Sequence, residues 1–410
     1  MTAWPARRLI QSGGNIMNAI SRPDELLVPH SVWGVYRADT PLFLATPAHT
    51  LLVCDVAEAI PHANAPLAAR VNHALQRARA DGHAGAAVVG AVPFDVDAPA
   101  VLRVARTMLR ARPLGAQRAA VPAGTRYATR EVPAADAYAD AVAQAVARIR
   151  AGELDKVVLA RTLEATGDAP VDVAALVARL ASCNPHGYTF SVDLGAGRTL
   201  LGASPELLVN RFGSVVRANP LAGSAPRSRD PVEDRRRAQA LLASAKDLDE
   251  HRVVVEAVRE NLAPLCRRLD VPARPSLVHT ETMWHLSTEV CGETDADALT
   301  LALALHPTPA VCGAPRAAAR DCIRDAEPFD RGFYAGMLGW VDARGDGEWV
   351  VTIRCAEAFD RTLRLYAGAG VVGESTPDGE RAETAAKFRT MLDALGIDRD
   401  AATGAAREFA

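Results

Sequence analysis

Four carboxylates form two closely spaced pairs in the second half of the chain, and their spacing could serve a metal ion. Asp247 and Glu250 are three residues apart within a helical pattern, and so are Glu380 and Glu383. This spacing places both side chains of a pair on one face of a helix. If the two faces converge, four carboxylates with no soft ligand nearby suit a hard cation such as Mg²⁺. The alternative is two solvated helix faces, because acid pairs are common on protein surfaces.

Two further ionisable residues lie where apolar strands are expected. Lys156 begins the run Lys-Val-Val-Leu-Ala-Arg, and a buried strand would carry its amine inward. Burial favours the neutral form of an amine, which can act as a general base. Glu206 precedes an apolar strand, and desolvation of a carboxyl favours its protonated form, a proton donor. The alternative for Lys156 is a side chain whose head stays in water, so neither role is settled by these residues alone.

The hydrophobic pattern predicts the elements that would position these residues. Helices are expected at residues 65–80, 134–152, 171–182, 231–265 and 379–395. Strands are expected at residues 51–56, 86–92, 155–163, 188–194, 200–201, 207–212, 215–218, 336–342, 348–357 and 362–367. Because strands arrive in neighbouring hairpins between long helices, we predict an α+β fold with mainly antiparallel sheet rather than a doubly wound parallel fold.

The first third of the chain carries no motif with evident chemistry. The segment 112–129 is rich in Pro and Gly and is the best candidate for a boundary. We therefore expect residues 1–130 to form an N-terminal part of the fold, residues 131–397 a catalytic core, and residues 398–410 a tail. Met17 could be the true start, which would make the first ~16 residues a disordered extension.

Composition excludes several classes of function. The chain has 410 residues, with 46 Lys and Arg against 49 Asp and Glu, so its net charge is −3. This balance argues against nucleic acid or an anionic membrane as the main partner, because both bind most strongly to proteins with an excess of basic residues. No apolar run approaches the roughly 20 residues that span a bilayer. The seven cysteines contain no CxxC pair, so we expect reduced thiols and a soluble cytoplasmic protein.

Two short motifs match known sites only in part. The segment 368–373 fits GxGxxG, but Pro377 discourages the helix start that a dinucleotide site needs at that loop. We interpret it as a glycine-rich loop whose amides could bind an anion. The segment 342–347 resembles the start of a calcium loop, but Arg344 occupies a ligand position and Ile353 replaces the bidentate glutamate.

Seven short motifs follow one another in a fixed order along the second part of the chain. They are residues 155–161, 202–208, 220–224, 246–251, 306–310, 366–370 and 380–384. Together they resemble the chorismate-utilising enzymes, and most of all the isochorismate synthases of siderophore pathways. The resemblance runs from about residue 134 to 395 and is weaker before that. It implies the fold of these chorismate-binding enzymes, a single large domain of mainly antiparallel sheets flanked by helices.

The resemblance also implies a site that binds chorismate over Mg²⁺. Glu250 and Glu383 would be direct metal ligands, and Asp247 and Glu380 would act through metal-bound waters. Arg354 would hold the enolpyruvyl carboxylate, because a guanidinium fork suits a planar anion. The other residues that the resemblance places in or near the pocket are Gly223, Ser224, His285, Ala310, Tyr334, Gly368, Ala369, Gly370 and Lys387.

In the reaction that the resemblance implies, Lys156 deprotonates a water that attacks C2 of chorismate, and Glu206 protonates the departing C4 hydroxyl. The resemblance therefore implies an isomerase, an isochorismate synthase. Anthranilate synthases usually carry Gln where Lys156 stands, and aminodeoxychorismate synthases carry Lys where Ala222 stands, so aminating members are disfavoured.

Three alternatives remain open. Salicylate synthases share Lys156 and Glu206 and then eliminate pyruvate, but they tend to have Thr where this chain has Ala310. Menaquinone-pathway isochorismate synthases catalyse the same step. A catalytically silent chorismate-binding protein would be expected to lack Lys156, Glu206 or a metal carboxylate, and all are present. A siderophore pathway would supply partner enzymes that act on isochorismate, such as a lyase and a dehydrogenase; no oligomeric state is predicted.

Overall fold

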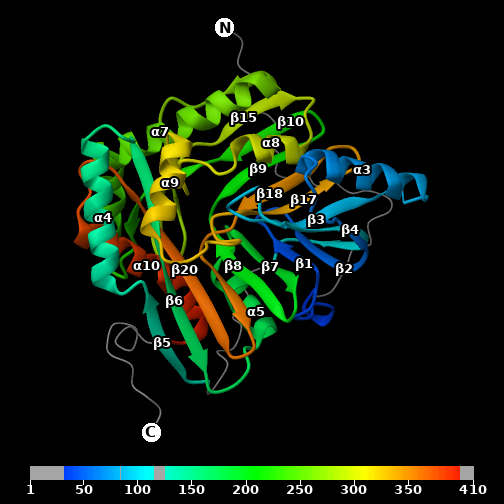
Figure 1. The fold of residues 1–410 in the computed structure, drawn as a ribbon, viewed down its shortest axis with the longest axis horizontal. Coiled ribbons are helices and arrows are strands. Elements are labelled where there is room, and N and C mark those ends of the chain that lie inside the picture. The colour runs from blue at the N-terminus through cyan, green and yellow to red at the C-terminus, as the bar shows by residue number, and fades with distance from the viewer. Residues whose placement is uncertain (1–31, 84, 115–124, 398–410) are drawn as a thin grey trace.

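The computed structural model describes residues 32–83, 85–114 and 125–397. Helices lie on the outer faces of one large curled sheet (Figure 1). No helix within the described ranges is long and apolar enough to cross a membrane. The helices in these ranges are the 3₁₀ turns η1 (Val32–Gly34) and η2 (Ala263–Leu265) and the α-helices α3 (Leu67–Ala80), α4 (Ala135–Arg150), α5 (Val173–Cys183), α6 (Pro231–Ala243), α7 (Ala245–Leu262), α8 (Ala298–Leu305), α9 (Arg316–Ala326) and α10 (Pro377–Leu395).

In the part of the chain that the structure describes, seventeen strands form the large sheet and three form a second sheet. The large sheet contains β1 (Leu42–Ala45), β2 (Thr50–Ala59), β3 (Ala87–Val92), β4 (Val101–Ala111), β5 (Tyr127–Val132), β6 (Lys156–Gly167), β7 (Tyr188–Gly195), β8 (Arg198–Ser204), β9 (Leu207–Phe212), β10 (Val215–Asn219), β12 (Cys266–Asp270), β15 (Val290–Thr294), β16 (Gly313–Ala314), β17 (Met337–Asp342), β18 (Gly347–Val351), β19 (Cys355–Phe359) and β20 (Thr362–Val371). The small sheet contains β11 (Leu221–Pro226), β13 (Ser276–His279) and β14 (Met283–Ser287).

The large sheet is one continuous antiparallel path. From β6 it passes through β20, β19, β8, β7, β1, β2, β4, β3, β17, β18, β9, β10 and β15 to β12. β5 and β16 share the other edge of β6. This architecture confirms the predicted α+β class with mainly antiparallel sheet and flanking helices.

Strands from the first third of the chain are inserted between strands from its end. β3 pairs with β17 so that Gly90 lies opposite Gly339, and β1 pairs with β7. The expected boundary segment 112–129 contains the start of β5, and its residues 115–124 lie outside the described residues. The expected N-terminal extension and the tail 398–410 also lie outside them.

Two expected elements are interrupted in the structure. The single helix predicted over residues 231–265 was wrong, because Ser244 is extended and separates α6 from α7. Its hydroxyl accepts a hydrogen bond from the Asp247 N–H and so begins α7 as an N-cap. The single strand predicted over residues 348–357 was also wrong: β18 ends at Val351 and β19 begins at Cys355.

A third correction concerns the glycine-rich segment 368–373, which we expected to be a loop. Its first four residues belong to β20, where Gly368 lies opposite Ala160 and Gly370 opposite Val158 of β6. The helix that follows, α10, packs on β20 and against α4 and α5 (Figure 1). Gly370 faces Lys156 of β6 and Glu250 of α7.

Close approach of strands makes one glycine a sensitive position. A Cβ on Gly339 would lie 1.9 Å from the Glu348 carbonyl oxygen across the β17–β18 pair. We expect Gly339→Ala to destabilise the protein by about 1–3 kcal/mol, because backbone must shift to admit the methyl group. The control Gly34→Ala, where nothing lies within 4 Å of the added atom, should change stability by less than about 0.5 kcal/mol. Urea unfolding midpoints test this, and equal midpoints for the two variants would contradict it.

Candidate active site

Most of the residues singled out from the sequence meet in one cavity of about 60 Å³ between β6, β20, β11, β14 and the helices α7 and α10. The predicted site residues that line it are Glu206, Gly223, Ser224, Glu250, His285, Ala310, Tyr334, Arg354, Gly368, Gly370, Glu383 and Lys387. Lys156, Asp247, Ala369 and Glu380 lie outside this lining. Ala369 is fully buried and faces the opposite side of β20 from its two glycine neighbours, because side chains alternate along a strand.

Lys156 lies directly behind the cavity wall, at the start of β6. Its side chain is 1% exposed, and its Nζ lies 2.8 Å from Glu250 Oε1 on α7. A Cβ on Gly370 would lie 2.2 Å from that carboxylate oxygen and 3.0 Å from Lys156 Cε. Glycine at this position of β20 therefore leaves the room in which the ion pair forms. This confirms that β6 carries the Lys156 amine into the interior, and the alternative of an amine in water is wrong.

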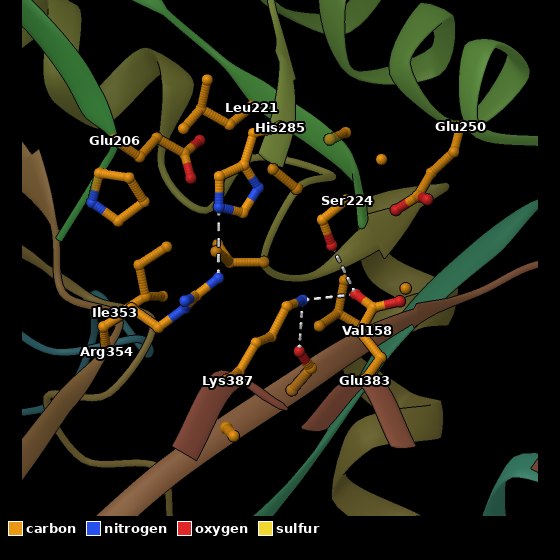
Figure 2. A pocket seen from close by; sticks show the side chains of 18 of the residues that line it. Val158, Glu206, Leu221, Ser224, Glu250, His285, Ile353, Arg354, Glu383 and Lys387 are labelled. Atoms are coloured by element: carbon orange, nitrogen blue, oxygen red, sulfur yellow. Dashed lines mark hydrogen bonds and ion pairs between the residues drawn. The ribbon is translucent and has the colours of Figure 1, made fainter. Parts of the chain in front are cut away.

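Glu206 lies between β8 and β9, on the side of the cavity opposite Glu250 (Figure 2). Its side chain is buried, and burial raises the pKa of its carboxyl to about 8. The pKa of Glu206 is lowered by a hydrogen bond from the Leu221 backbone and by the charges of Lys156, Lys387 and Arg354. These effects do not outweigh desolvation. At neutral pH this carboxyl is therefore protonated and can donate a proton.

Arg354 reaches the cavity because the chain breaks between β18 and β19. Its φ of +50° turns the backbone, an unfavourable conformation for a residue with a Cβ and one that functional sites often contain. Burial lowers the pKa of the guanidinium to about 10, which leaves it charged. Its Nη2 donates to His285 Nε2 at 3.4 Å, and its Nη1 has no hydrogen-bond partner within the described ranges (Figure 2).

The surroundings of Arg354 suit an anion. Burial, together with Arg354 and Lys387, holds the pKa of His285 well below its usual range, so this imidazole is neutral. Tyr334 lines the same cavity, and its ring stacks on that of Tyr366 with centroids 5.0 Å apart. A charged, incompletely hydrogen-bonded guanidinium in a cavity with polar lining favours a planar carboxylate as its ligand.

The two carboxylate pairs come from α7 and α10, as predicted, and lysines neutralise them. Lys387 lies 2.7 Å from Glu383, whose Oε1 also accepts a hydrogen bond from Ser224 at 3.1 Å (Figure 2). Lys246 lies 3.0 Å from the buried Glu380, whose Oε2 has no hydrogen-bond partner within the described part of the chain. The two helix faces therefore form a partly buried charge cluster and not the alternative of two solvated faces.

The pKa directions show that the four carboxylates influence one another. Burial raises the pKa of Asp247, and the charges of Glu250 and Glu383 raise it further. Burial and Glu383 raise the pKa of Glu380. Burial alone would raise the pKa of Glu383, but the interactions with Lys387, Lys246 and Ser224 outweigh burial and lower it. Among the residues described, no three His, Cys, Asp or Glu side chains already converge as metal ligands.

Sequence reasoning missed several residues of the site. Lys246 was part of a recognised motif but had no assigned role, and only the fold shows that it pairs with Glu380. The remaining missed lining residues are apolar or aromatic neighbours of the predicted ones, and strand alternation was the signal that could have found Val158 and Tyr366. They are Val158, Pro205, Leu221, Ala222, Val311, Ile353, Tyr366 and Ala367.

The chain is similar to several isochorismate synthases. Isochorismate synthase DhbC of Bacillus subtilis (strain 168) is 52% identical over 372 residues, which cover 87% of this chain and 94% of that protein. The vibriobactin-specific isochorismate synthase of Vibrio cholerae serotype O1 is 43% identical over 370 residues, which cover 88% of this chain and 92% of that protein. The crystal structure of DhbC from Bacillus anthracis superposes with a TM-score of 0.85 at 48% identity, covering 90% of this chain and 99% of that one.

A family model also matches residues 100–396, which include every predicted site residue, and it is described as chorismate binding enzyme. Together with the identities above, this match confirms the resemblance drawn from the seven sequence motifs. The chain belongs to the family of chorismate-binding enzymes.

Proposed function

We propose that this protein is an isochorismate synthase, an isomerase that moves the hydroxyl of chorismate from C4 to C2. The observation that carries the proposal is the placement of Glu206, a protonated carboxyl, across the cavity from Glu250 (Figure 2), whose carboxylate pairs with Lys156 behind the cavity wall. A base and an acid on opposite sides of a flat ring are what this reaction requires. The similarity to isochorismate synthases over most of the chain supports the same reaction.

The proposed reaction conserves atoms and electrons. Lys156, in its neutral amine form and not as the ammonium of the ion pair with Glu250, takes a proton from a water whose oxygen forms a bond to C2 of the ring. The ring double bonds shift, the bond between C4 and its hydroxyl oxygen breaks, and Glu206 gives its proton to the departing oxygen. One water enters and one leaves, so the product is an isomer of the substrate and no oxidant or reductant is needed.

Substrate binding in this proposal uses the cationic end of the cavity. Arg354 holds the enolpyruvyl carboxylate, and its burial makes each hydrogen bond to an anion stronger than it would be in water. Tyr334 and His285 lie beside it, and His285, being neutral, can accept a hydrogen bond from the guanidinium. Gly223 and Ser224 line the opposite wall with backbone that can approach the ligand closely.

We further propose that Mg²⁺ is the cofactor. The donor set fits it, because Glu250, Glu383, Asp247 and Glu380 offer only oxygen atoms and no soft ligand lies among them. The unpartnered Oε2 of Glu380 also leaves a buried acceptor available. Glu250 and Glu383 would bind the ion directly, and Asp247 and Glu380 through waters. When bound, the ion would balance the negative charge of the substrate and orient its ring carboxylate.

The vibriobactin-specific relative leads us to propose a siderophore pathway as the use of the product, with enzymes that act on isochorismate as pathway partners. Ala310 lines the cavity, where the family resemblance places Thr in salicylate synthases. This favours a reaction that stops at isochorismate.

The first test identifies the product. We expect the purified protein to convert chorismate with Mg²⁺ into isochorismate alone, as seen by chromatography, and to lose activity with EDTA until excess Mg²⁺ is restored. Salicylate together with pyruvate would instead establish salicylate synthase activity. If chorismate binds but is never consumed in a Mg²⁺-dependent way, the protein is a silent binder and the proposal is wrong.

The second test concerns the acid and the base. We expect Lys156→Ala and Glu206→Gln each to lower kcat by about 100-fold or more, because each removes a proton transfer from the transition state. Glu348→Gln is the matched control: Glu348 is also fully buried and its pKa is raised by burial to about 7, but it lies outside the cavity. Normal turnover in either site variant, or an equal loss in the control, would refute the assigned roles.

The third test is the pH profile. Because the acid must be protonated, kcat/KM should fall as the pH rises through the pKa of Glu206, about 8 in the free protein. Above that pH the decline should approach about tenfold per unit. A decline that begins only near pH 10 would count against Glu206 as the acid.

A further inference from the structure

A buried ion pair behind the cavity takes no part in the proposed reaction. Arg331 Nε donates to Glu327 Oε2 at 2.8 Å, and its Nη2 donates to Oε1 at 2.6 Å. Both side chains are 3% exposed. Burying two charges is costly unless the remaining donors and acceptors are also satisfied, so the other contacts of this pair indicate what it does.

Those contacts lie on the edge of β6, between its two strand neighbours. β16 pairs with the beginning of β6, and β5 pairs with its second half. Between them, the Val158 carbonyl accepts a hydrogen bond from Arg331 Nη2 at 2.7 Å, and the Ala160 N–H donates to Glu327 Oε1 at 2.7 Å. The ion pair thus supplies the acceptor and donor that an adjacent strand would otherwise supply.

Arg331 also contacts the cavity wall at three places that are far apart in the sequence. Besides the Val158 carbonyl, its Nη1 donates to the Val311 carbonyl at 2.8 Å, and its guanidinium lies 5.7 Å from the centre of the Tyr334 ring. Val158, Val311 and Tyr334 all line the cavity. One guanidinium therefore joins a strand, a loop and an aromatic side chain from directly behind the site.

We propose that Glu327 and Arg331 are positioning residues that hold the start of β6, and with it Lys156, at a set distance from the Val311 and Tyr334 wall. This inference rests on the proposed role of Lys156 as the base. Lys156 lies two residues before Val158 on the same strand. A shift of the strand would therefore move the Lys156 amine relative to the ring of the proposed substrate, whose enolpyruvyl carboxylate Arg354 holds. A misplacement of about 1 Å can lower a rate by about 100-fold.

Two variants test the proposal. Glu327→Met with Arg331→Met removes both charges together, which avoids a lone buried charge and favours a folded protein. Arg331→Lys keeps a cation beside Glu327 but lacks the planar fork that reaches two carbonyls and a carboxylate at once. We expect kcat to fall by about 100-fold in the double variant and by less in Arg331→Lys. KM should change little, because Arg354 and Ser224 lie on other segments.

A second readout does not depend on activity. Hydrogen exchange of residues 156–161 should become faster in both variants, while the rest of the sheet keeps its protection. The matched control is Arg103→Met with Asp193→Met, which removes a partly buried ion pair between β4 and β7 whose Nη2 to Oδ2 distance is 3.0 Å. This control should leave kcat and the exchange of β6 unchanged.

The outcomes separate the two proposals. If the unmodified protein does not convert chorismate, the proposed function fails, and hydrogen exchange still decides whether the pair holds β6. Folded variants with normal kcat, or with normal exchange of residues 156–161, would overturn the positioning role. An equal loss of kcat in the Arg103 and Asp193 control would also overturn it, because the effect would then be general. If the double variant does not fold, Arg331→Lys is judged by the same two measurements.

Discussion

The pairing of β6 with β20 is the interaction on which the site depends. It runs in unbroken antiparallel register from Thr362 opposite Thr166 to Val371 opposite Val157. β6 carries Lys156 at its start, and β20 carries the glycines that leave room beside it. Because α10 packs on β20, the same pairing also brings the carboxylates of α10 toward those of α7. A shift in this register by one residue would turn Lys156 to the other face.

A second constraint is charge balance among partly buried side chains. Acidic side chains from α7 and α10 lie beside lysines from three different elements, with distances of 2.7–3.0 Å between the charged groups. Burial of this many ionisable groups is tolerated because each has an opposite charge nearby. The site is therefore close to neutral without a ligand, although its proposed substrate is an anion and its proposed cofactor a cation. Binding the two together would preserve that balance.

Local pattern was enough to predict much of the fold and the composition of the site. The helix 134–152 and the strand 207–212 followed from apolar periodicity, and they match α4 and β9 closely. The spacing of Glu380 and Glu383 correctly placed both on one helix. These features depend on residues that are neighbours in the chain, which is why they can be read from sequence.

Features that depend on distant contacts could not be predicted in the same way. The glycines of β20 looked like a loop, because an isolated glycine-rich run does not show that β6 will pair with it. The turn at Arg354 interrupts a run of β-branched residues that would otherwise continue as a strand. Nothing local indicated that Glu250 would meet Lys156, since they come from a helix and a strand nearly a hundred residues apart. Such pairs become visible only once the tertiary structure is known.

The interleaved order of the sheet has a consequence for how the protein is made. β3 pairs with β17, and β6 pairs with β20. Strands that are synthesised early can therefore form these pairs only after the last strands have been synthesised. Contacts of such large sequence separation slow folding and leave strand edges exposed in the meantime. On the ribosome, the cavity cannot close until α10 has emerged. The protein therefore acquires its chemistry all at once, at the end of translation, and a chain interrupted before that point would contain most of the residues but no site.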